Sequence, residues 1–287
     1  MPVLSHVDPD RTVAASGPQS VSGPAPAPLR DAPRSLLAAV HGVMTDIDDT
    51  LTRDGAIEPV ALQALHALHD AGVPVVAITG RPMGWSEPFA RQWPVAAIVA
   101  ENGGVALRRA GGELRVEYAQ PQAERAVHAR RLREVAERVL RELPHARLAR
   151  DSAGRVTDIA VDHSEFERLD AASIERVVAL MRQEGMTATV SSIHVNGWFG
   201  THTKWSGAQW MLQRLYGRRL DDELERWAYV GDSTNDQAMF ERFPLSVGVA
   251  NLMDFAAQLT IWPAFLTDAE RGAGFAELAR ALLDARG

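Results

Sequence analysis

The sequence places several carboxylates directly after a largely apolar run. Residues 36–44 form this run, and Asp46, Asp48 and Asp49 follow it within Thr45-Asp46-Ile47-Asp48-Asp49-Thr50. A short apolar segment of this kind predicts a buried strand that carries the acidic side chains at its carboxyl end, where open α/β sheets place their sites. Because like charges at contact distance repel one another, such a cluster requires a cation or another compensating partner.

Two further apolar segments end in polar clusters. Residues 73–78 precede Thr79-Gly80-Arg81-Pro82, and residues 227–230 precede Gly231-Asp232-Ser233-Thr234-Asn235-Asp236. If the strands are parallel, the three clusters lie on one edge of the sheet. Oxygen ligands suit Mg²⁺, which often shares its site with a substrate phosphate. The sequence therefore predicts a Mg²⁺ site built from the carboxylate positions Asp46, Asp48, Asp232 and Asp236.

Lys204 is the only lysine among 30 basic side chains. It opens a predicted helix that carries apolar residues at helical spacing. A chain that uses arginine elsewhere but keeps one lysine indicates a position that needs a compact ammonium group. We expect Lys204 to supply a point charge for phosphoryl oxygens, together with Thr79 and the N–H groups around Gly80.

The order of elements predicts an α/β fold with a Rossmann-like parallel sheet. Apolar strands alternate with amphipathic helices over residues 35–118 and again over residues 200–287. That pattern is typical of a parallel sheet covered on both faces. Residues 119–199 instead predict a helix, a hairpin over 147–163, a second helix and one long strand over 187–198. We interpret this segment as an inserted α+β cap domain.

Composition limits the remaining classes. Residues 1–34 are rich in Pro, Ser, Ala and Gly, which predicts a disordered extension. The net charge of −7 without a basic block argues against a nucleic-acid partner, and no segment is long and apolar enough for a membrane span. There is no cysteine, and no secretory signal precedes the first strand, so we expect a cytoplasmic protein. The sequence carries no indication of oligomeric state.

Taken together, the motifs resemble those of the haloacid dehalogenase superfamily of phosphohydrolases. Its first motif, Asp-x-Asp-x-Thr, matches Asp46 to Thr50; the second matches Thr79, the third Lys204, and the fourth the segment from Gly231 to Asp236. An α+β insertion between the second and third motifs is similar to the caps of class IIB members, which include phosphatases for trehalose phosphate, sucrose phosphate and mannosylphosphoglycerate. Asp49 stands where the superfamily often has glycine, which adds charge but removes no needed group.

The resemblance implies a Mg²⁺-dependent phosphatase acting on a phosphate monoester, with a sugar phosphate as the expected substrate. Asp46 would attack phosphorus to form an aspartyl phosphate, and Asp48 would act as general acid and then general base. Asp46, the Asp48 carbonyl and Asp232 would hold the metal. Asp236 would hold a metal-bound water or orient Lys204. The residues implied to bind substrate in the core are Thr79, Gly80, Arg81, Lys204 and Asn235.

Two alternatives stay open at this point. A phosphomutase or phosphotransferase uses the same aspartyl phosphate, and a non-catalytic regulatory homologue is also compatible with the fold. The acid at Asp48 favours phosphate esters over haloacids, because a halide leaving group needs no proton.

Substrate selection is expected from the cap. His194, Asn196 and Trp198 share one face of the predicted strand and are candidates for contacting a sugar. Further candidates in the cap are Asp162, His163 and Glu165.

Overall fold

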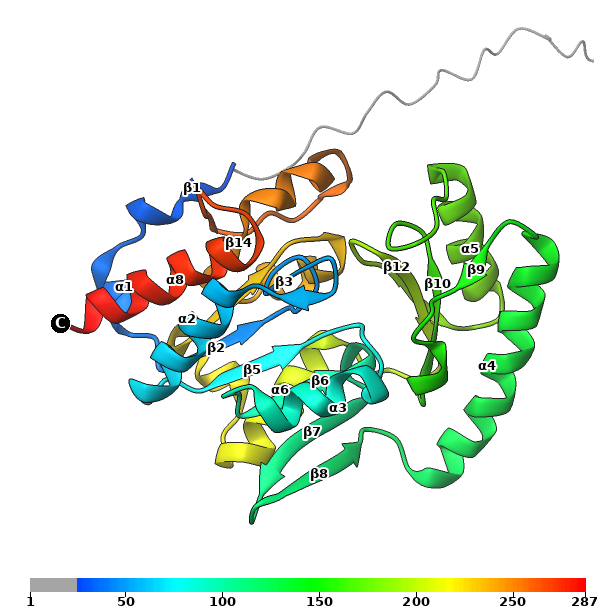
Figure 1. The fold of residues 1–287 in the computed structure, drawn as a ribbon, viewed down its shortest axis with the longest axis horizontal. Coiled ribbons are helices and arrows are strands. Elements are labelled where there is room, and N and C mark those ends of the chain that lie inside the picture. The colour runs from blue at the N-terminus through cyan, green and yellow to red at the C-terminus, as the bar shows by residue number, and fades with distance from the viewer. Residues whose placement is uncertain (1–24) are drawn as a thin grey trace, which may run out of the picture.

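The computed structural model describes residues 25–287, and a nine-stranded sheet forms its centre (Figure 1). The strand order is β1-β15-β14-β13-β2-β5-β6-β7-β8. All neighbours from β1 through to β6 run parallel, whereas β7 and β8 add an antiparallel hairpin at one edge. The strands of this sheet are β1 (Ala27–Pro28), β2 (Gly42–Thr45), β5 (Val75–Ile78), β6 (Ala97–Ala100), β7 (Val105–Ala110), β8 (Glu113–Tyr118), β13 (Trp227–Gly231), β14 (Leu245–Gly248) and β15 (Phe265–Leu266).

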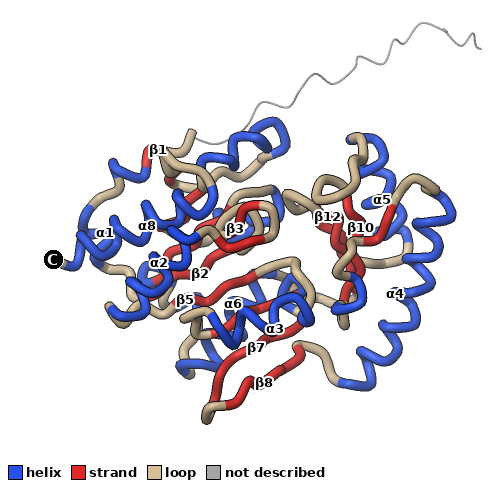
Figure 2. The backbone as a smooth tube through the Cα atoms, viewed as in Figure 1, coloured by secondary structure: helices blue, strands red, loops and turns tan. Residues whose placement is uncertain are grey.

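Helices cover both faces of this sheet, as Figure 2 shows in blue against the red strands. Successive strand residues point to opposite faces, so Val43 joins the core cluster on one face and Met44 the cluster on the other. The first face is packed by α1 (Arg34–Ala38), α2 (Pro59–Asp70), α3 (Met83–Gln92) and α8 (Arg271–Arg286), and the second by α6 (Lys204–Tyr216) and α7 (Gln237–Phe240). Because both faces are buried, the strands read as continuous apolar runs, and the predicted α/β class is confirmed.

A second, antiparallel sheet lies within the segment predicted as the cap. Its order is β11-β12-β10-β9, and Figure 1 shows it in green and olive beside the nine-stranded sheet. One face is packed by α4 and α5 through a separate apolar cluster. The elements are α4 (Gln122–Glu142), β9 (Arg147–Leu148), β10 (Asp158–Asp162), α5 (Ala171–Gln183), β11 (Thr187–Val190) and β12 (His194–Trp198). The chain crosses between the two sheets after Tyr118 and after Trp198, close to the predicted limits of the cap at 119 and 199.

Part of the predicted amino-terminal extension is folded. Residues 1–24 lie outside the described part of the chain, but Ala27 and Pro28 pair with β15 and Leu29 is buried. The prediction of disorder for residues 25–34 is therefore wrong. Leu29 packs in the same core cluster as α8, which supplies the apolar burial that composition alone did not reveal.

Two predicted strands divide into smaller elements. The apolar run 36–44 contains the end of α1 and then β2, because the short helix is apolar where it packs on the sheet. The predicted long strand 187–198 is a hairpin of β11 and β12. The Ser191 N–H donates to the carbonyl of His194, and the Ser191 hydroxyl oxygen accepts from the His194 N–H at 3.0 Å, which closes the turn.

A small hairpin of β3 (Thr52–Arg53) and β4 (Ala56–Ile57) follows the acidic cluster and was not predicted. Its turn is Asp54-Gly55, with φ of 52° and 75°, a pair that commonly marks such turns. Among the described residues, no helix has both the length and the hydrophobicity that crossing a membrane requires.

Candidate active site

The carboxyl ends of β2, β5 and β13 bring the predicted motifs together. Thr45 is in register with Ala77 on one side and Val230 on the other, so the residues that follow these strands meet at one edge. The Asp46 N–H donates to the carbonyl of Val230 at 2.9 Å, which ties the first motif to the strand that carries the fourth. Parallel register is thus what gathers segments about 180 residues apart in sequence.

Lys204 lies between two carboxylates at this edge. Its Nζ donates to Asp46 Oδ1 and to Asp236 Oδ1, each at 2.7 Å, and to Asn235 Oδ1 at 3.3 Å. Burial lowers the pKa of Lys204, but the charges of Asp236 and Asp46 outweigh this effect and raise it above the ordinary value. The charged ammonium form is therefore favoured. The Thr203 side chain caps α6 and fixes the start of the helix that carries Lys204.

Asp236 has its full set of donors within the protein. Besides Lys204, the Tyr229 hydroxyl donates to its Oδ1 at 2.5 Å, and the N–H groups of Asp232 and Ser233 donate to its Oδ2. Gly231 permits this arrangement, because a Cβ there would lie 2.4 Å from Asp236 Oδ2. This geometry suits the predicted role of orienting Lys204; a metal-binding role for Asp236 stays a prediction.

Asp232 presents a buried oxygen without a donor. The Thr50 hydroxyl donates to Oδ1 at 3.2 Å, whereas Oδ2 has no hydrogen-bond partner among the described residues. Carboxylate oxygens of Asp46, Asp232 and Asp236 lie within 4.8 Å of one another. Burial, followed by the charges of Asp46 and Asp236, raises the pKa of Asp232 well above its usual value. An orphaned carboxylate oxygen among three buried acids fits a hard divalent cation such as Mg²⁺.

This fit leads to a measurable expectation. Mg²⁺ should raise the melting temperature, because a ligand that binds only the folded state stabilises it, by about 2.7 kcal/mol at a concentration 100 times its Kd. The Asp232→Asn variant should lose most of this shift, while its metal-free form should be at least as stable as the wild type, since one repelling charge is gone. Thermal unfolding with Mg²⁺ and with EDTA tests both statements. An undiminished Mg²⁺ shift in the variant would remove Asp232 from the metal site.

Asp48 is held by Arg81, from the segment after β5. The Arg81 Nε donates to Asp48 Oδ1 at 2.8 Å and to Oδ2 at 3.0 Å. The same guanidinium reaches two loops of the cap segment, where it pairs with Glu165 at 2.8 Å and with Asp151 at 3.2 Å. Arg81 is only 4% exposed, so these are buried ion pairs that connect the predicted acid of the first motif to two carboxylates of the cap segment.

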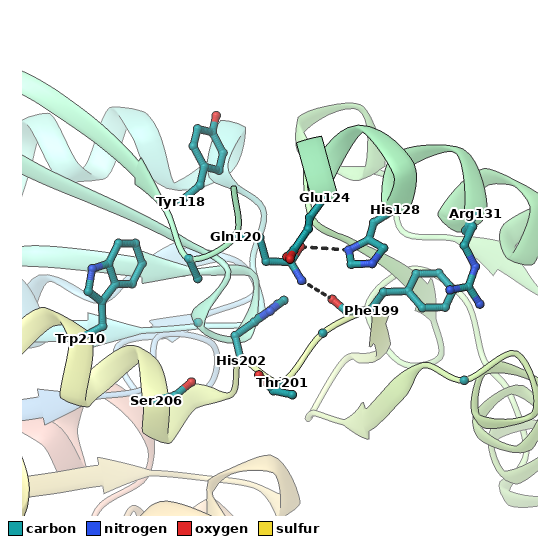
Figure 3. Close-up of a pocket in the computed structure, with 14 residues that line it drawn as sticks. Tyr118, Gln120, Glu124, His128, Arg131, Phe199, Thr201, His202, Ser206 and Trp210 are labelled. Carbon is teal, nitrogen blue, oxygen red and sulfur yellow. Dashed lines mark hydrogen bonds between the residues drawn. The ribbon is translucent and has the colours of Figure 1, made fainter. Parts of the chain in front are cut away.

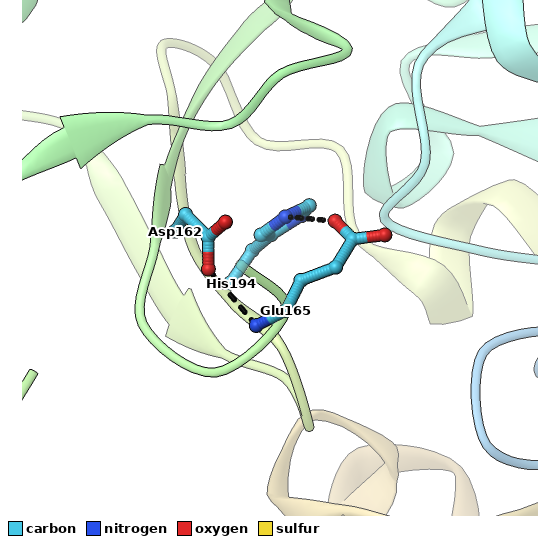
Figure 4. A group of neighbouring side chains, drawn as sticks. All are labelled: Asp162, Glu165 and His194. Atoms are coloured by element: carbon cyan, nitrogen blue, oxygen red, sulfur yellow. Dashed lines mark hydrogen bonds and ion pairs between the residues drawn. The ribbon is translucent and has the colours of Figure 1, made fainter. Parts of the chain in front are cut away.

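Glu165 forms part of a small cluster with Asp162 and His194, shown in Figure 4. The His194 Nε2 lies 3.0 Å from Glu165 Oε2, and the Asp162 carboxylate accepts the N–H groups of residues 164–166. Burial opposes ionisation of Glu165, but His194 and Arg81 outweigh it and lower its pKa to about 2. These partners satisfy the cluster without a metal, and they orient Glu165 toward Arg81.

The other predicted binding residues have distinct positions. The Thr79 hydroxyl accepts from the Arg81 N–H at 3.0 Å, and the Gly80 carbonyl accepts from Arg155 at 2.9 Å. Asn196 donates to the same carbonyl at 3.3 Å and to Asp158 at 3.2 Å, which places it at the junction of the two sheets. Trp198 is 1% exposed, and its Nε1 donates to the His202 carbonyl. It therefore packs between segments, and a direct substrate contact by Trp198 stays a prediction.

A cavity of about 470 Å³ opens beside Asp48, Arg81 and Asp232. The cap segment contributes a loop over residues 164–168 to its wall, and the core contributes the β3–β4 hairpin and Arg271. Arg271 lies at φ 50° and donates from Nε to Asp49 Oδ1 at 2.9 Å. The cavity is thus lined by residues of the acidic cluster together with side chains from both the core and the cap segment.

Several residues of this site were not singled out from the sequence. Glu101, at φ 50°, is fully buried and accepts from the N–H groups of Val156 and Thr157 and from the Thr157 hydroxyl, so it fastens the core to the cap segment. Arg155 is buried between Asp151 and Asp158. The cap-segment partners of Glu101 lie 55 and 56 residues away in sequence, so no local spacing predicts these contacts. The Glu-Asn-Gly-Gly segment after β6 was the only sequence signal.

The chain is similar in sequence to known hydrolases. Residues 43–140 match the model of the haloacid dehalogenase-like hydrolases. The chain is 30% identical over 242 residues to a phosphoglycolate phosphatase of Methanothrix thermoacetophila, which covers 83% of this chain and 95% of that protein.

Solved structures share the fold at low identity. A crystal structure of a Thermoplasma acidophilum protein aligns with a TM-score of 0.63 at 17% identity, over 85% of this chain and 98% of that one. The sucrose-phosphatase of Synechocystis, in complex with sucrose and phosphate, aligns with a TM-score of 0.60 at 14% identity, over 84% and 97%. The chain belongs to the haloacid dehalogenase-like hydrolase family and is a phosphoric monoester hydrolase.

Proposed function

We propose that this hydrolase removes phosphate from a sugar phosphate through an aspartyl phosphate on Asp46. The observation that carries the proposal is the buried group around Lys204, whose ammonium lies 2.7 Å from both Asp46 and Asp236 beside the orphaned Asp232 oxygen. A fixed positive charge next to a carboxylate is suited to a reaction in which that carboxylate meets an anionic phosphoryl group.

In the first half-reaction, a carboxylate oxygen of Asp46 attacks phosphorus and forms a new P–O bond. The bond from phosphorus to the ester oxygen breaks, and Asp48 gives its proton to the leaving alkoxide. Arg81 keeps Asp48 oriented, since a protonated carboxyl can still accept from the guanidinium through its other oxygen. Lys204, Thr79 and the Asn235 amide bind the equatorial phosphoryl oxygens, where negative charge is spread in the transition state.

In the second half-reaction, the Asp48 carboxylate takes a proton from water as the water attacks the aspartyl phosphate. Inorganic phosphate leaves, and both aspartates return to their starting states. Mg²⁺, held by Asp46, Asp232 and the carbonyl of Asp48, would supply charge neutralisation between the two anions. Among the described hydrogen bonds, none is accepted by the Asp48 carbonyl, so it is available for that contact.

The sugar-phosphate class is supported by the size and lining of the cavity. A volume of about 470 Å³ beside Asp48 accommodates a leaving group larger than a two-carbon acid. The walls mix Arg81, Arg168 and Arg271 with acidic and amide side chains, which suits a ligand with many hydroxyl groups. Phosphoglycolate, the substrate named for the Methanothrix relative, is the natural competitor.

Phosphate release from a panel of substrates tests this proposal. The panel contains hexose phosphates, sucrose 6-phosphate, trehalose 6-phosphate and phosphoglycolate, each assayed with Mg²⁺ and with EDTA. We expect Mg²⁺-dependent release that is fastest from one or two sugar phosphates. A preference for phosphoglycolate would overturn the substrate class but keep the phosphatase. A sugar bisphosphate product without phosphate release would identify a mutase, and silence in folded protein that binds Mg²⁺ would favour a regulatory role.

A further inference from the structure

A second cavity lies where the chain passes between the two sheets. Residues 119–121 lead from β8 into α4, and residues 199–203 lead from β12 back to α6. A cavity of about 790 Å³ is lined by both linkers, as Figure 3 shows, with α4 contributing one wall and α6 another. No residue lines both this cavity and the one beside Asp48. The two spaces are therefore separate, and the phosphatase chemistry makes no use of this one.

His202 is a buried polar group in this cavity whose hydrogen-bonding capacity is unused. It is 6% exposed, and neither ring nitrogen has a hydrogen-bond partner within the described part of the chain. Burial, assisted by the nearby His128, lowers the pKa of His202 to about 4, so the imidazole is neutral near pH 7. A neutral imidazole offers one N–H donor and one nitrogen acceptor. Leaving buried groups of this kind unpaired is energetically unfavourable.

The ring of His202 is held in position by its neighbours. Trp198 stacks on it with ring centroids 5.6 Å apart, and the Trp198 Nε1 donates to the His202 carbonyl at 2.9 Å. Gly200, at φ 107°, passes close to the ring. A Cβ there would lie 2.1 Å from the Gln120 Nε2 and 3.4 Å from the His202 Nδ1. The glycine thus allows the two linkers to meet, and Figure 3 shows the imidazole between Gln120 and Thr201.

Most other polar groups of the wall are already paired. Gln120 donates to the Phe199 carbonyl at 2.9 Å, and its Oε1 lies 3.1 Å from the His128 Nδ1. The Ser206 hydroxyl takes part in the cap of α6. The permanent charges of the lining are one basic group, Arg131, and one acidic group, Glu124. The two charges of the lining are opposite and equal in number. A ligand that bonds to the free donor and acceptor of His202 therefore needs no net charge.

The aromatic lining indicates the shape of such a ligand. Arg131 covers the Phe199 ring at 3.9 Å, and Arg125 covers the Tyr118 ring at 3.6 Å. Trp210, from α6, is half-buried and also lines the cavity. The indole offers an apolar surface against which the C–H face of a sugar ring packs well.

We propose that the cavity between the two linkers binds a neutral polyhydroxylated ring compound, such as an unphosphorylated sugar. A hydroxyl group both donates and accepts, so adjacent hydroxyls complete the two missing bonds of His202. The site differs from the catalytic one in charge, since the latter is built around buried carboxylates and a lysine. An occupant would touch both connections between the core and the cap segment at once.

Ligand-observed NMR tests this site directly, using glucose, mannose and sucrose as probes without Mg²⁺ or substrate. We expect at least one probe to bind with roughly millimolar affinity, the range usual for small neutral ligands with few charged contacts. Two variants should weaken binding at least tenfold. His202→Phe removes both nitrogens but keeps an aromatic ring. Ala119→Trp fills the cavity from an exposed linker position, where we expect a large side chain to leave the fold intact.

The matched control is His66→Phe, the same replacement at an exposed position on α2, which should bind like the wild type. Unchanged affinity in Ala119→Trp would show that the sugar binds elsewhere and would overturn the proposal. Absence of binding of all three probes to the wild type would also overturn it, leaving water as the partner of His202. An unphosphorylated sugar is also the product of the proposed reaction and could enter the cavity beside Asp48. Ala119 and His202 line only the cavity between the linkers, so the two variants distinguish the sites.

Discussion

Replacing Asp46 by asparagine should reduce kcat by about 10⁴-fold or more while leaving the fold intact. The amide is a poor nucleophile, so the aspartyl phosphate cannot form. Its oxygen can still accept from Lys204, and one of three neighbouring buried carboxylates loses its charge. We therefore expect the metal-free variant to unfold at the same temperature as the wild type or a higher one. Steady-state phosphate release and a thermal melt measure both quantities.

The matched control for this variant is Asp70→Asn, the same chemical change at the exposed end of α2. It should keep turnover within a factor of about two, as surface substitutions away from a site usually do. Near-normal turnover by folded Asp46→Asn would refute Asp46 as the nucleophile and, with it, the proposed intermediate.

Lys204→Met should damage both activity and stability. Removing the ammonium leaves Asp46 and Asp236 buried without their cation, and breaking a buried ion pair in this way typically costs about 3–5 kcal/mol. Activity should fall by at least about 10³-fold, because a fixed charge at the phosphoryl oxygens is lost. Denaturant unfolding gives the first number, and phosphate release at saturating substrate gives the second.

A double variant separates the two effects. Adding Asp236→Asn to Lys204→Met removes one of the stranded charges, so it should recover part of the lost stability without restoring activity. The double variant is compared with the two single variants, Lys204→Met and Asp236→Asn. If the losses of stability of the two single variants simply add up in the double variant, the direct pairing of Lys204 with Asp236 is contradicted. Recovery of turnover in the double variant would contradict a role for the ammonium at the phosphoryl group.

The acidic edge of the sheet could be predicted from sequence because each of its parts is local. Asp46, Thr79 and Asp232 each follow a short apolar strand, and Lys204 opens a helix with an apolar stripe. Parallel strands buried on both faces have a recognisable composition, and their carboxyl ends must lie together. Strand alternation likewise placed His194, Asn196 and Trp198 on one face of β12, opposite Val195, which joins the apolar cluster of the cap segment.

Contacts between the two sheets could not be predicted in this way. Arg81 holds Asp48 on one side and Glu165 and Asp151 on the other, across 33, 84 and 70 residues of sequence. Glu101 accepts a hydrogen bond from Thr157 while its backbone has φ of 50°. This left-handed conformation is uncommon for glutamate, so local sequence preferences do not predict it. These pairings depend on how the cap segment sits on the core, which is a matter of long-range packing and not of local pattern.

The sequence by itself determined the strand-end motifs, the single lysine and the α/β class, since each depends on residue type and short-range periodicity. Only the tertiary structure decided that Trp198 is buried, that residues 187–198 fold back as a hairpin, and that the two linkers enclose a cavity around His202. The physical reason is that burial and hydrogen-bond satisfaction depend on which distant segments meet. The local sequence around a histidine does not reveal whether its buried ring nitrogens, like those of His202, will lack hydrogen-bond partners or be fully paired.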